Sequence, residues 1–139
     1  MLFIKRPETD PYFNLAAEEY IFHNYKEDVI MLWRNTPAVI IGKHQNPYRE
    51  VNIAFARDHQ LPVIRRISGG GTVYHDIGNL NFTFIRSAPS KDRVNYKAFL
   101  QPLISILNRW AIPCELAGKS DLMVHHRKIS GNSQHVFKN

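Results

Sequence analysis

Hydrophobic and polar residues follow one another along the chain in patterns that predict short strands separated by helices. After an opening strand at Leu2–Ile4, the stretch "TDPYFNLAAEEYIFHNY" predicts a helix, with Asp10 as its N-cap and Pro11 as its first residue. At about 100° per residue, the apolar face of this helix also includes Glu19. That face consists of Tyr12, Leu15, Ala16, Tyr20 and Phe22. Because an unpaired buried carboxylate is costly, we expect Glu19 to be a partnered structural residue, with a substrate-facing role as the alternative.

Runs of β-branched and apolar residues predict the strands that follow. Val29–Trp33 and Ala38–Ile41 are separated by the turn sequence "RNTP", so we expect two adjacent antiparallel strands. A short helix capped by Asn52 precedes the strand in "LPVIRRI". The stretches "TVYH" and "LNFTFI" then alternate, which predicts a strand pair joined by the turn "DIGN".

Another helix and a hairpin are predicted in the last third of the chain. Apolar residues recur there at spacings of three and four, although Pro102 interrupts them and predicts a kink or a helix start near Gln101. The hairpin joins "SDLMV" to "RKISG" across His125 and His126, and a last strand is expected from His135. The order β-α-ββ-α-βββ-α-βββ indicates an α+β fold, with a mixed, mostly antiparallel sheet and flanking helices. The apolar helix positions are Tyr96, Phe99, Leu100, Leu103, Leu107 and Trp110.

Composition limits the class of protein. With 139 residues, of which 44% are hydrophobic and 22% charged, the chain has the make-up of one ordinary globular domain. Its net charge of +6 predicts an acidic partner, such as nucleic acid, a phosphorylated ligand or an acidic protein surface. The single cysteine, Cys114, excludes an internal disulfide framework and is expected to be buried in a strand. Without a signal segment or an apolar run of membrane-spanning length, a cytoplasmic protein with no membrane partner is expected.

The stretch "RRISGGGTVYHDIGN" is the first candidate for chemistry. Three consecutive glycines, Gly69 to Gly71, allow positive φ and close approach of a ligand to the main chain, where N–H groups can form an anion-binding nest. Arg65 and Arg66 carry forked donors, but on a strand they point to opposite faces, so at most one is expected to reach the site. A tight strand connection is the alternative, and neither the P-loop spacing nor GxGxxG is present.

Two further features carry charge. His75 and Asp76 are neighbours on a strand and diverge, so a positioning or hydrogen-bonding role is favoured over metal ligation or a catalytic couple. The histidines lack HxxxH and HExxH spacing, which gives no support for zinc. Lys128, in "RKISGNSQ", can present a fixed positive charge to a developing negative charge, although most such lysines are simply solvated. Alternation places Arg127 on the opposite face and Asp121 near the same hairpin.

Four stretches together resemble a known family. The segment "RRISGGGTVYHDIGNLNFTF" strongly resembles the signature of the lipoate-protein ligases, and "SDLMVHHRKISGNSQ" resembles their second motif. The stretches "DPYFNLAAEEY" and "LWRNTPAVIIGKHQNPYREVN" agree with the same family, so the resemblance runs from about residue 2 to residue 139. It implies the mixed sheet and helices shared by biotin ligases and the core of class II aminoacyl-tRNA synthetases. Because "HVFKN" ends the chain within an expected strand, residues 1–139 are expected to be a catalytic domain truncated at its C-terminal end, without the accessory domain.

The resemblance also implies an activity. ATP would activate lipoate as lipoyl-AMP, with Mg²⁺, and the lipoyl group would pass to a lysine of lipoyl domains in 2-oxoacid dehydrogenase E2 subunits and the glycine cleavage H protein. Alternatives are an octanoyl or lipoyl acyltransferase with a nucleophilic cysteine, a transferase that takes preformed lipoyl-AMP, and a non-catalytic lipoyl-nucleotide binding module. The sequence Gly69-Gly70-Gly71-Thr72 favours the ligase over the acyltransferase. No nucleic-acid partner is expected, because the aromatic residues are not interleaved with the basic ones.

The family motifs imply roles for individual residues. Lys128 would be the catalytic residue, and Asp121 would hold the nucleotide or Mg²⁺. Two departures from the family concern the second motif, where His125-His126 replaces a turn pair such as Asp-Gly and Ser120 replaces an asparagine. An apolar tunnel for the dithiolane chain is expected along Val29–Trp33 and Ala38–Ile41. The substrate- and nucleotide-binding residues would be Arg65, Ser68, Gly69, Gly70, Gly71, Thr72, Val73, His75, Asp76, Asn79 and Asp121, with Arg34, Asn46, Ser130, Gly131 and Gln134 as weaker candidates.

Overall fold

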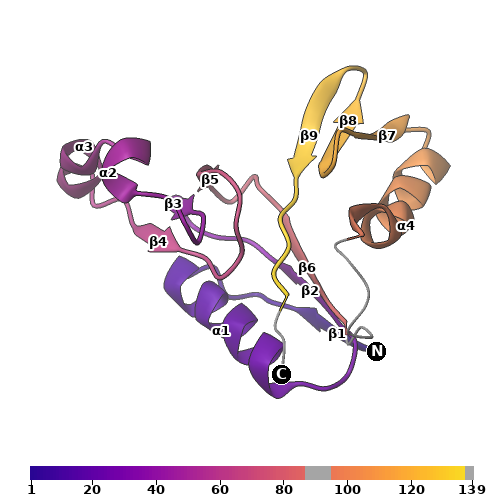
Figure 1. Cartoon of the computed structure of the whole chain (residues 1–139), viewed down its shortest axis with the longest axis horizontal. Coiled ribbons are helices and arrows are strands. Elements are labelled where there is room, and N and C mark those ends of the chain that lie inside the picture. Colours follow the sequence, from indigo (N-terminus) through magenta and orange to yellow (C-terminus); the bar gives the residue numbers. More distant parts are fainter. Residues whose placement is uncertain (87–94, 137–139) are drawn as a thin grey trace. The chain divides into compact units, whose positions relative to one another are not determined.

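The structure is a computed structural model that describes residues 1–86 and 95–136. The chain divides into two compact units, Met1–Ser87 and Ala88–Asn139. Both units contain helices and short strands, which confirms the α+β class (Figure 1). None of the helices in the described ranges is long and apolar enough to cross a membrane.

The first unit contains most of the elements. The predicted N-cap is confirmed, because the Asp10 side chain accepts a hydrogen bond from the Phe13 N–H at the start of the first long helix. Asn52 caps its helix in the same way, and an additional short helix, which the pattern did not predict, begins after Asn46. The elements are β1 (Leu2–Lys5), α1 (Pro11–Asn24), β2 (Val29–Trp33), β3 (Ala38–Ile41), α2 (Pro47–Glu50), α3 (Ile53–Asp58), β4 (Val63–Arg65), β5 (Val73–His75) and β6 (Asn81–Ile85).

The strands of this unit form two three-stranded sheets, in the orders β1-β2-β6 and β4-β3-β5. In each sheet the central strand has one parallel and one antiparallel neighbour. The predicted pairings of β2 with β3 and of β5 with β6 are therefore wrong, since each pair is split between the two sheets. The "RNTP" connection does not close a hairpin because Asn35 within it is fully buried and hydrogen-bonded to Asn14 and His75.

The core of the first unit lies between α1 and the two sheets. It includes Met31 and Ile40 at the centres of their sheets, both 1% exposed, together with Leu15 of α1. The predicted face of α1 is only partly right, because Tyr12 and Tyr20 are 58% and 62% exposed. Apolar residues occur nearly all round this helix, so their period does not select one face. The buried residues of α1 are Pro11, Asn14, Leu15 and Ile21.

The second unit consists of α4 (Tyr96–Arg109) and an antiparallel sheet of β7 (Cys114–Ala117), β8 (Asp121–Val124) and β9 (Arg127–Gly131). The predicted helix start near Gln101 is wrong, because Asn95 caps α4 and the helix continues through Pro102. Leu100 and Ile104, on either side of the proline, are buried and fix this helix in place. Burial of Cys114 is confirmed, and it raises the pKa of the thiol.

The hairpin of the second unit is confirmed. Its two turn residues, His125 and His126, both have positive φ, at 47° and 61°, as a two-residue hairpin turn with the right twist requires. The register shifts between Leu122 and Met123, which leaves Ile129 as an extra residue in β9. Residues 132–136 form no strand, so the last strand expected from His135 is absent there, and its remainder lies outside the described residues.

Candidate functional site

The glycine loop, residues 68–72, leaves β4 and leads into β5. Gly70 has a φ of 91°, which only glycine adopts easily. Side chains at Gly69 and Gly71 would meet nothing within 4 Å, so the space beside these residues is open. A second constraint comes from Gly42 at the end of β3, where a Cβ would overlap the carbonyl oxygen of Gly70. The loop therefore needs glycine at Gly70 for its conformation and at Gly42 for close packing.

The two arginines before the loop both bind main-chain carbonyls. Arg66 donates to Gly69 O, at 2.6 and 3.1 Å, and to Gly71 O at 2.8 Å. Burial lowers the pKa of Arg66, partly offset by the charge of Glu18. Arg65 donates to the carbonyls of the neighbouring segment at distances of 2.8 to 3.2 Å. Only Arg66 is hydrogen-bonded to the loop itself, because the hydrogen bonds of Arg65 go to Gly42, Lys43 and Gln45. That at most one of the two arginines reaches a bound ligand stays a prediction.

Carbonyl binding by Arg66 leaves the loop amides available. Within the described residues, the N–H groups of Gly69, Gly70 and Gly71 donate no hydrogen bond. A run of main-chain donors beside open space is the arrangement that binds anions. Thr72, at the end of the loop, donates its hydroxyl to Gln45 Oε1 at 2.8 Å. The loop thus combines fixed carbonyls with free amide donors.

His75 belongs to a buried polar network. Its Nδ1 lies 3.2 Å from Asn35 Nδ2 and 3.5 Å from Asn81 Nδ2, which places the ring proton on Nε2. Asn14 of α1 donates to Asn35 and extends the network. Burial lowers the pKa of His75, as does the charge of Arg66, while Asp76 opposes both. The favoured hydrogen-bonding role of His75 is confirmed, and binding of a substrate remains a prediction.

Three further predicted residues of this unit, Asp76, Asn79 and Asn46, have structural roles. Asp76 accepts from the Gly78 N–H at 2.8 Å and from the Asn79 N–H, through its carbonyl, at 3.0 Å. Asn79 donates to Asn81 Oδ1 at 2.8 Å. Asn46 caps α2, whereas the Arg34 side chain is exposed. The contacts of Asp76 and Asn79 account for the turn after β5, and they do not by themselves indicate that a ligand binds there.

Glu18 is a half-buried carboxyl that the sequence prediction missed, since the helix pattern selected Glu19. Thr83 donates its hydroxyl to Glu18 Oε1 at 2.6 Å, and Trp33 donates to the same hydroxyl oxygen at 3.1 Å. Burial raises the pKa of Glu18, against the effects of Thr83 and Arg66. The sequence did contain a signal for Glu18. It lies seven residues after the buried Pro11 and four after the buried Asn14, so it falls on the same face of the helix as these two residues.

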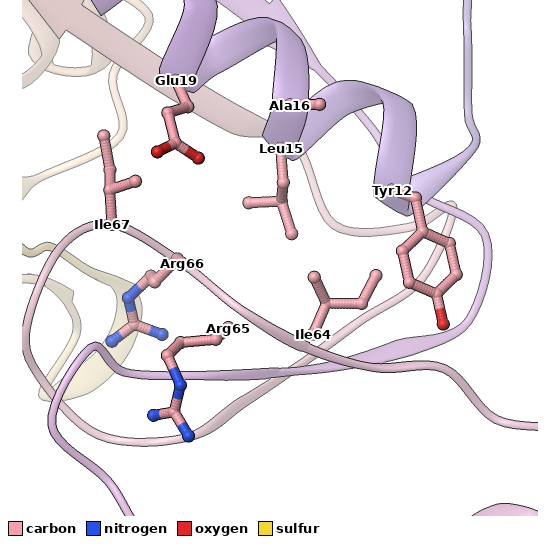
Figure 2. A pocket seen from close by; sticks show the side chains of 8 residues that line it. All are labelled: Tyr12, Leu15, Ala16, Glu19, Ile64, Arg65, Arg66 and Ile67. Carbon is pink, nitrogen blue, oxygen red and sulfur yellow. The ribbon is translucent and has the colours of Figure 1, made fainter.

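Glu19 instead lines an open cavity of about 200 Å³ between α1 and the chain around β4. Figure 2 shows Glu19 on the α1 side of this cavity and Arg65 and Arg66 on the opposite side. Glu19 is exposed and makes no hydrogen bond or ion pair with any described residue, so the expectation of a paired structural carboxylate is wrong. Solvent access removes the need for a partner. The other residues that line the cavity are Tyr12, Leu15, Ala16, Ile64 and Ile67.

In the second unit, Lys128 forms an ion pair with Asp121. Lys128 Nζ lies 2.8 Å from Asp121 Oδ2, and both side chains are partly exposed. Lys128 pairs with Met123, so it shares a face of the sheet with Asp121, two residues earlier on β8. A Cβ at Gly131 would lie 3.0 Å from Lys128 Cε and 3.1 Å from Nζ, so glycine allows the lysine to lie across this position.

The end of this hairpin is closed by Asn132, which donates to the Ser120 carbonyl from its side chain at 2.6 Å and from its main chain at 3.2 Å. Ser130 donates to Asn132 Oδ1 at 3.4 Å, and Gln134 is half-buried. No group of three His, Cys, Asp or Glu side chains among the described residues could hold a metal ion. Asp121 pairs with Lys128 through Oδ2, and its Oδ1 makes no hydrogen bond with the described residues.

The contact between Gly42 and Gly70 predicts a difference between two alanine variants. Gly42→Ala should lower the free energy of unfolding by roughly 1–3 kcal/mol, because its Cβ overlaps a main-chain carbonyl that cannot turn aside. Gly69→Ala is the control and should stay within about 0.5 kcal/mol, since its Cβ enters open space. Urea denaturation of the intact protein measures both, and equal losses would contradict the close contact.

The buried imidazole predicts a pH dependence of stability. The folded-state pKa of His75 is lowered, so its contribution is present above the ordinary value of 6.5 and is lost as the pH falls through the folded-state pKa. Below pH 6.5, wild type should therefore lose more stability than His75→Gln, by no more than about 1.4 kcal/mol per pH unit. Unfolding by urea between pH 8 and pH 5 measures the difference. Parallel curves would show that His75 does not titrate in this way.

The chain is similar to known proteins in both sequence and structure. Residues 10–139 match the lipoyl protein ligase A/B catalytic domain. The chain is 42% identical to lipoate-protein ligase LplJ of Bacillus subtilis over 99% of its length, and it covers 43% of that protein. The structure of P. falciparum LipL1 in complex with lipoate has a TM-score of 0.85 at 30% identity, covering 99% of this chain and 45% of that one. A crystal structure of lipoate-protein ligase A bound with ATP has a TM-score of 0.81 at 26% identity, covering 99% of this chain and 61% of that one.

The chain thus spans less than half the length of LplJ, while the family match covers nearly all of the chain. Both sequence motifs, the glycine loop and the Lys128 hairpin, lie within the matched residues. The chain belongs to the lipoyl protein ligase A/B catalytic domain family.

Proposed function

We propose that the protein is a lipoate-protein ligase, which activates lipoate with ATP and transfers the lipoyl group to a lysine of lipoyl domains. The observation that carries the proposal is the glycine loop, whose amides donate no hydrogen bond to a described residue while Arg66 holds the carbonyls of Gly69 and Gly71. The names of the relatives, lipoate-protein ligases and structures with lipoate or ATP, support the same substrates. Because this chain spans only part of those relatives, the activity is proposed for the intact protein.

In the activation step, a lipoate carboxylate oxygen attacks the α-phosphorus of ATP. A new oxygen–phosphorus bond forms, the bond to pyrophosphate breaks, and lipoyl-AMP results. Two anions must approach each other, so preorganised donors are needed more than covalent chemistry. The Gly69–Gly71 amides are the proposed donors to the adenylate. The other residues proposed for the lipoate and nucleotide site are Arg65, Ser68, Thr72, Val73, His75, Asp76, Asn79 and Asp121.

In the transfer step, the amine of the target lysine attacks the acyl carbon, the bond to the phosphate oxygen breaks, AMP leaves and the nitrogen loses a proton. We assign to Lys128 the binding of the carbonyl and phosphate oxygens, which stabilises the negative charge that develops in both steps. Asp121 holds Lys128 in the free protein and has one oxygen available for Mg²⁺. Five residues remain weaker candidates for the site. Asn46 and Ser130 have only structural contacts, and the Arg34 side chain is exposed. The other two are Gly131 and Gln134.

The protein acceptor is proposed on chemical grounds. A net charge of +6 suits an acidic protein surface, and the E2 subunits of 2-oxoacid dehydrogenases and the glycine cleavage H protein are the proposed acceptors. The requirement for ATP and the single free cysteine fit a cytoplasmic location. A nucleophilic-cysteine acyltransferase is disfavoured within this chain, because its single cysteine is buried and has a raised thiol pKa.

Pyrophosphate exchange tests the proposed activity directly. The intact protein with lipoate, ATP and Mg²⁺ should incorporate labelled pyrophosphate into ATP, because the activation step is reversible. Omission of lipoate is the control and should abolish incorporation. Absence of exchange, together with transfer from supplied lipoyl-AMP, would instead identify a transferase; absence of both, with lipoyl-AMP bound, would identify a binding module.

Lys128→Ala tests the assigned catalytic residue. The variant should lower kcat for exchange and for transfer from lipoyl-AMP by roughly a hundredfold to a thousandfold, as removal of one transition-state donor does. The free energy of unfolding should change by less than about 1 kcal/mol, because the ion pair with Asp121 is partly exposed. Lys119→Ala removes an exposed lysine between β7 and β8 and serves as the charge-matched control. Equal kcat values for the two variants would remove Lys128 from the mechanism.

A further inference from the structure

The segment Gly42–Gln45, which follows β3, is bound to the glycine loop by hydrogen bonds at Lys43 and Gln45. The Lys43 N–H donates to Ser68 O at 2.9 Å, and the Thr72 hydroxyl donates to the Gln45 side chain at 2.8 Å. Gly42 packs directly against the Gly70 carbonyl. The position of the loop therefore depends on this second segment, about twenty-five residues earlier in the sequence.

Gln45 makes the side-chain contact that joins the two segments. Its Oε1 accepts from the Gly42 N–H at 2.8 Å and from the Thr72 hydroxyl at 2.8 Å. A carboxamide oxygen has two acceptor positions, and both are used here. The carbonyl of Gln45 is itself held by Arg65 at 2.8 Å, so the side chain extends from a fixed main chain.

This contact also fixes the hydroxyl of Thr72. Since the hydroxyl donates to Gln45, its single hydrogen is not available to a ligand. Thr72 directly follows Gly69–Gly71, whose amides donate no hydrogen bond to a described residue, so its position affects where these donors lie. A displacement of about 1 Å at such a surface can cost a hundredfold in rate.

We propose that Gln45 is a positioning residue for the activation step: through one oxygen it holds Gly42 and Thr72 together and fixes the glycine loop for the adenylate. The inference rests on the proposed function. It assigns to Gln45 a role through Thr72 and the loop, with no contact to the reacting atoms.

The first test is kinetic. Gln45→Met keeps the size of the side chain and removes the amide, and it should lower kcat for lipoate-dependent pyrophosphate exchange by about tenfold to a hundredfold. Gln101→Met, on the exposed surface of α4, is the matched control and should exchange at the wild-type rate. Thr72→Val should be impaired as well, and Thr72→Ser, which keeps the hydroxyl, should retain more activity.

A double-mutant cycle separates positioning from general damage. If Gln45 acts through Thr72, the double variant Gln45→Met/Thr72→Val should be little worse than the more impaired single variant, whereas independent effects would multiply. Multiplied losses, or a wild-type kcat in Gln45→Met, overturn the inference.

The second test needs no activity. In the ligand-free intact protein, Gln45→Met should speed hydrogen exchange of the Lys43 amide about tenfold, because its bond to Ser68 depends on the joined segments. If wild type shows no pyrophosphate exchange, the proposed function fails, and the Lys43 amide still reports on Gln45. An unchanged Lys43 amide then overturns the positioning role, and a faster one supports it.

Discussion

The guanidinium of Arg66 determines which groups the glycine loop presents to its surroundings. By binding the carbonyls of Gly69 and Gly71, it turns the acceptors of this segment towards protein. The amides of the same residues are left without partners among the described residues, beside space that no side chain fills. A loop of glycines alone would have no such preference, because each peptide could turn either way. The arginine thus converts a flexible sequence into a surface of donors, which is what an acyl phosphate requires.

Buried polar groups fix the surroundings of the loop in the same manner. Asn14, Asn35 and His75 form a chain of hydrogen bonds from α1 through the connection between the two sheets to β5. The hydrogen bond from Thr83 to Glu18 is a second link from α1 to the strands, and it reaches β6. Each of these groups would be costly to bury without its partner, so the network permits few alternative arrangements of the elements. Because these groups are removed from water, the pKa of His75 is lowered and the pKa of Glu18 is raised.

The local pattern of apolar and polar residues predicted the helices and strands well, but it predicted poorly which strands pair with each other. Alternation and N-caps depend on neighbouring residues, so the strands, the Asp10 cap and the His125-His126 hairpin were predictable. Strand pairing depends on contacts distant in sequence, such as Asn35 with His75, and the expected pairing failed there. The glycine loop and the Lys128 hairpin were candidates from their residues, and the family motifs then implied their roles. Gln45 was not, because a glutamine beside a turn carries no signal until Gly42 and Thr72 are seen to share its oxygen.

Arg66 and Lys128 differ in how firmly each is held within its own unit, and this difference argues for different roles. Arg66 binds three carbonyls, and releasing it would leave those acceptors and the loop unsupported. Lys128 binds one carboxylate in a partly exposed ion pair, which is worth no more than about 1 kcal/mol and is easily exchanged for another anion. Under the proposed mechanism, Lys128 leaves Asp121 to bind the oxygens of an adenylate, and a weak resting contact permits this exchange. Arg66 is therefore suited to fixing the loop, and Lys128 to binding charge that appears during reaction.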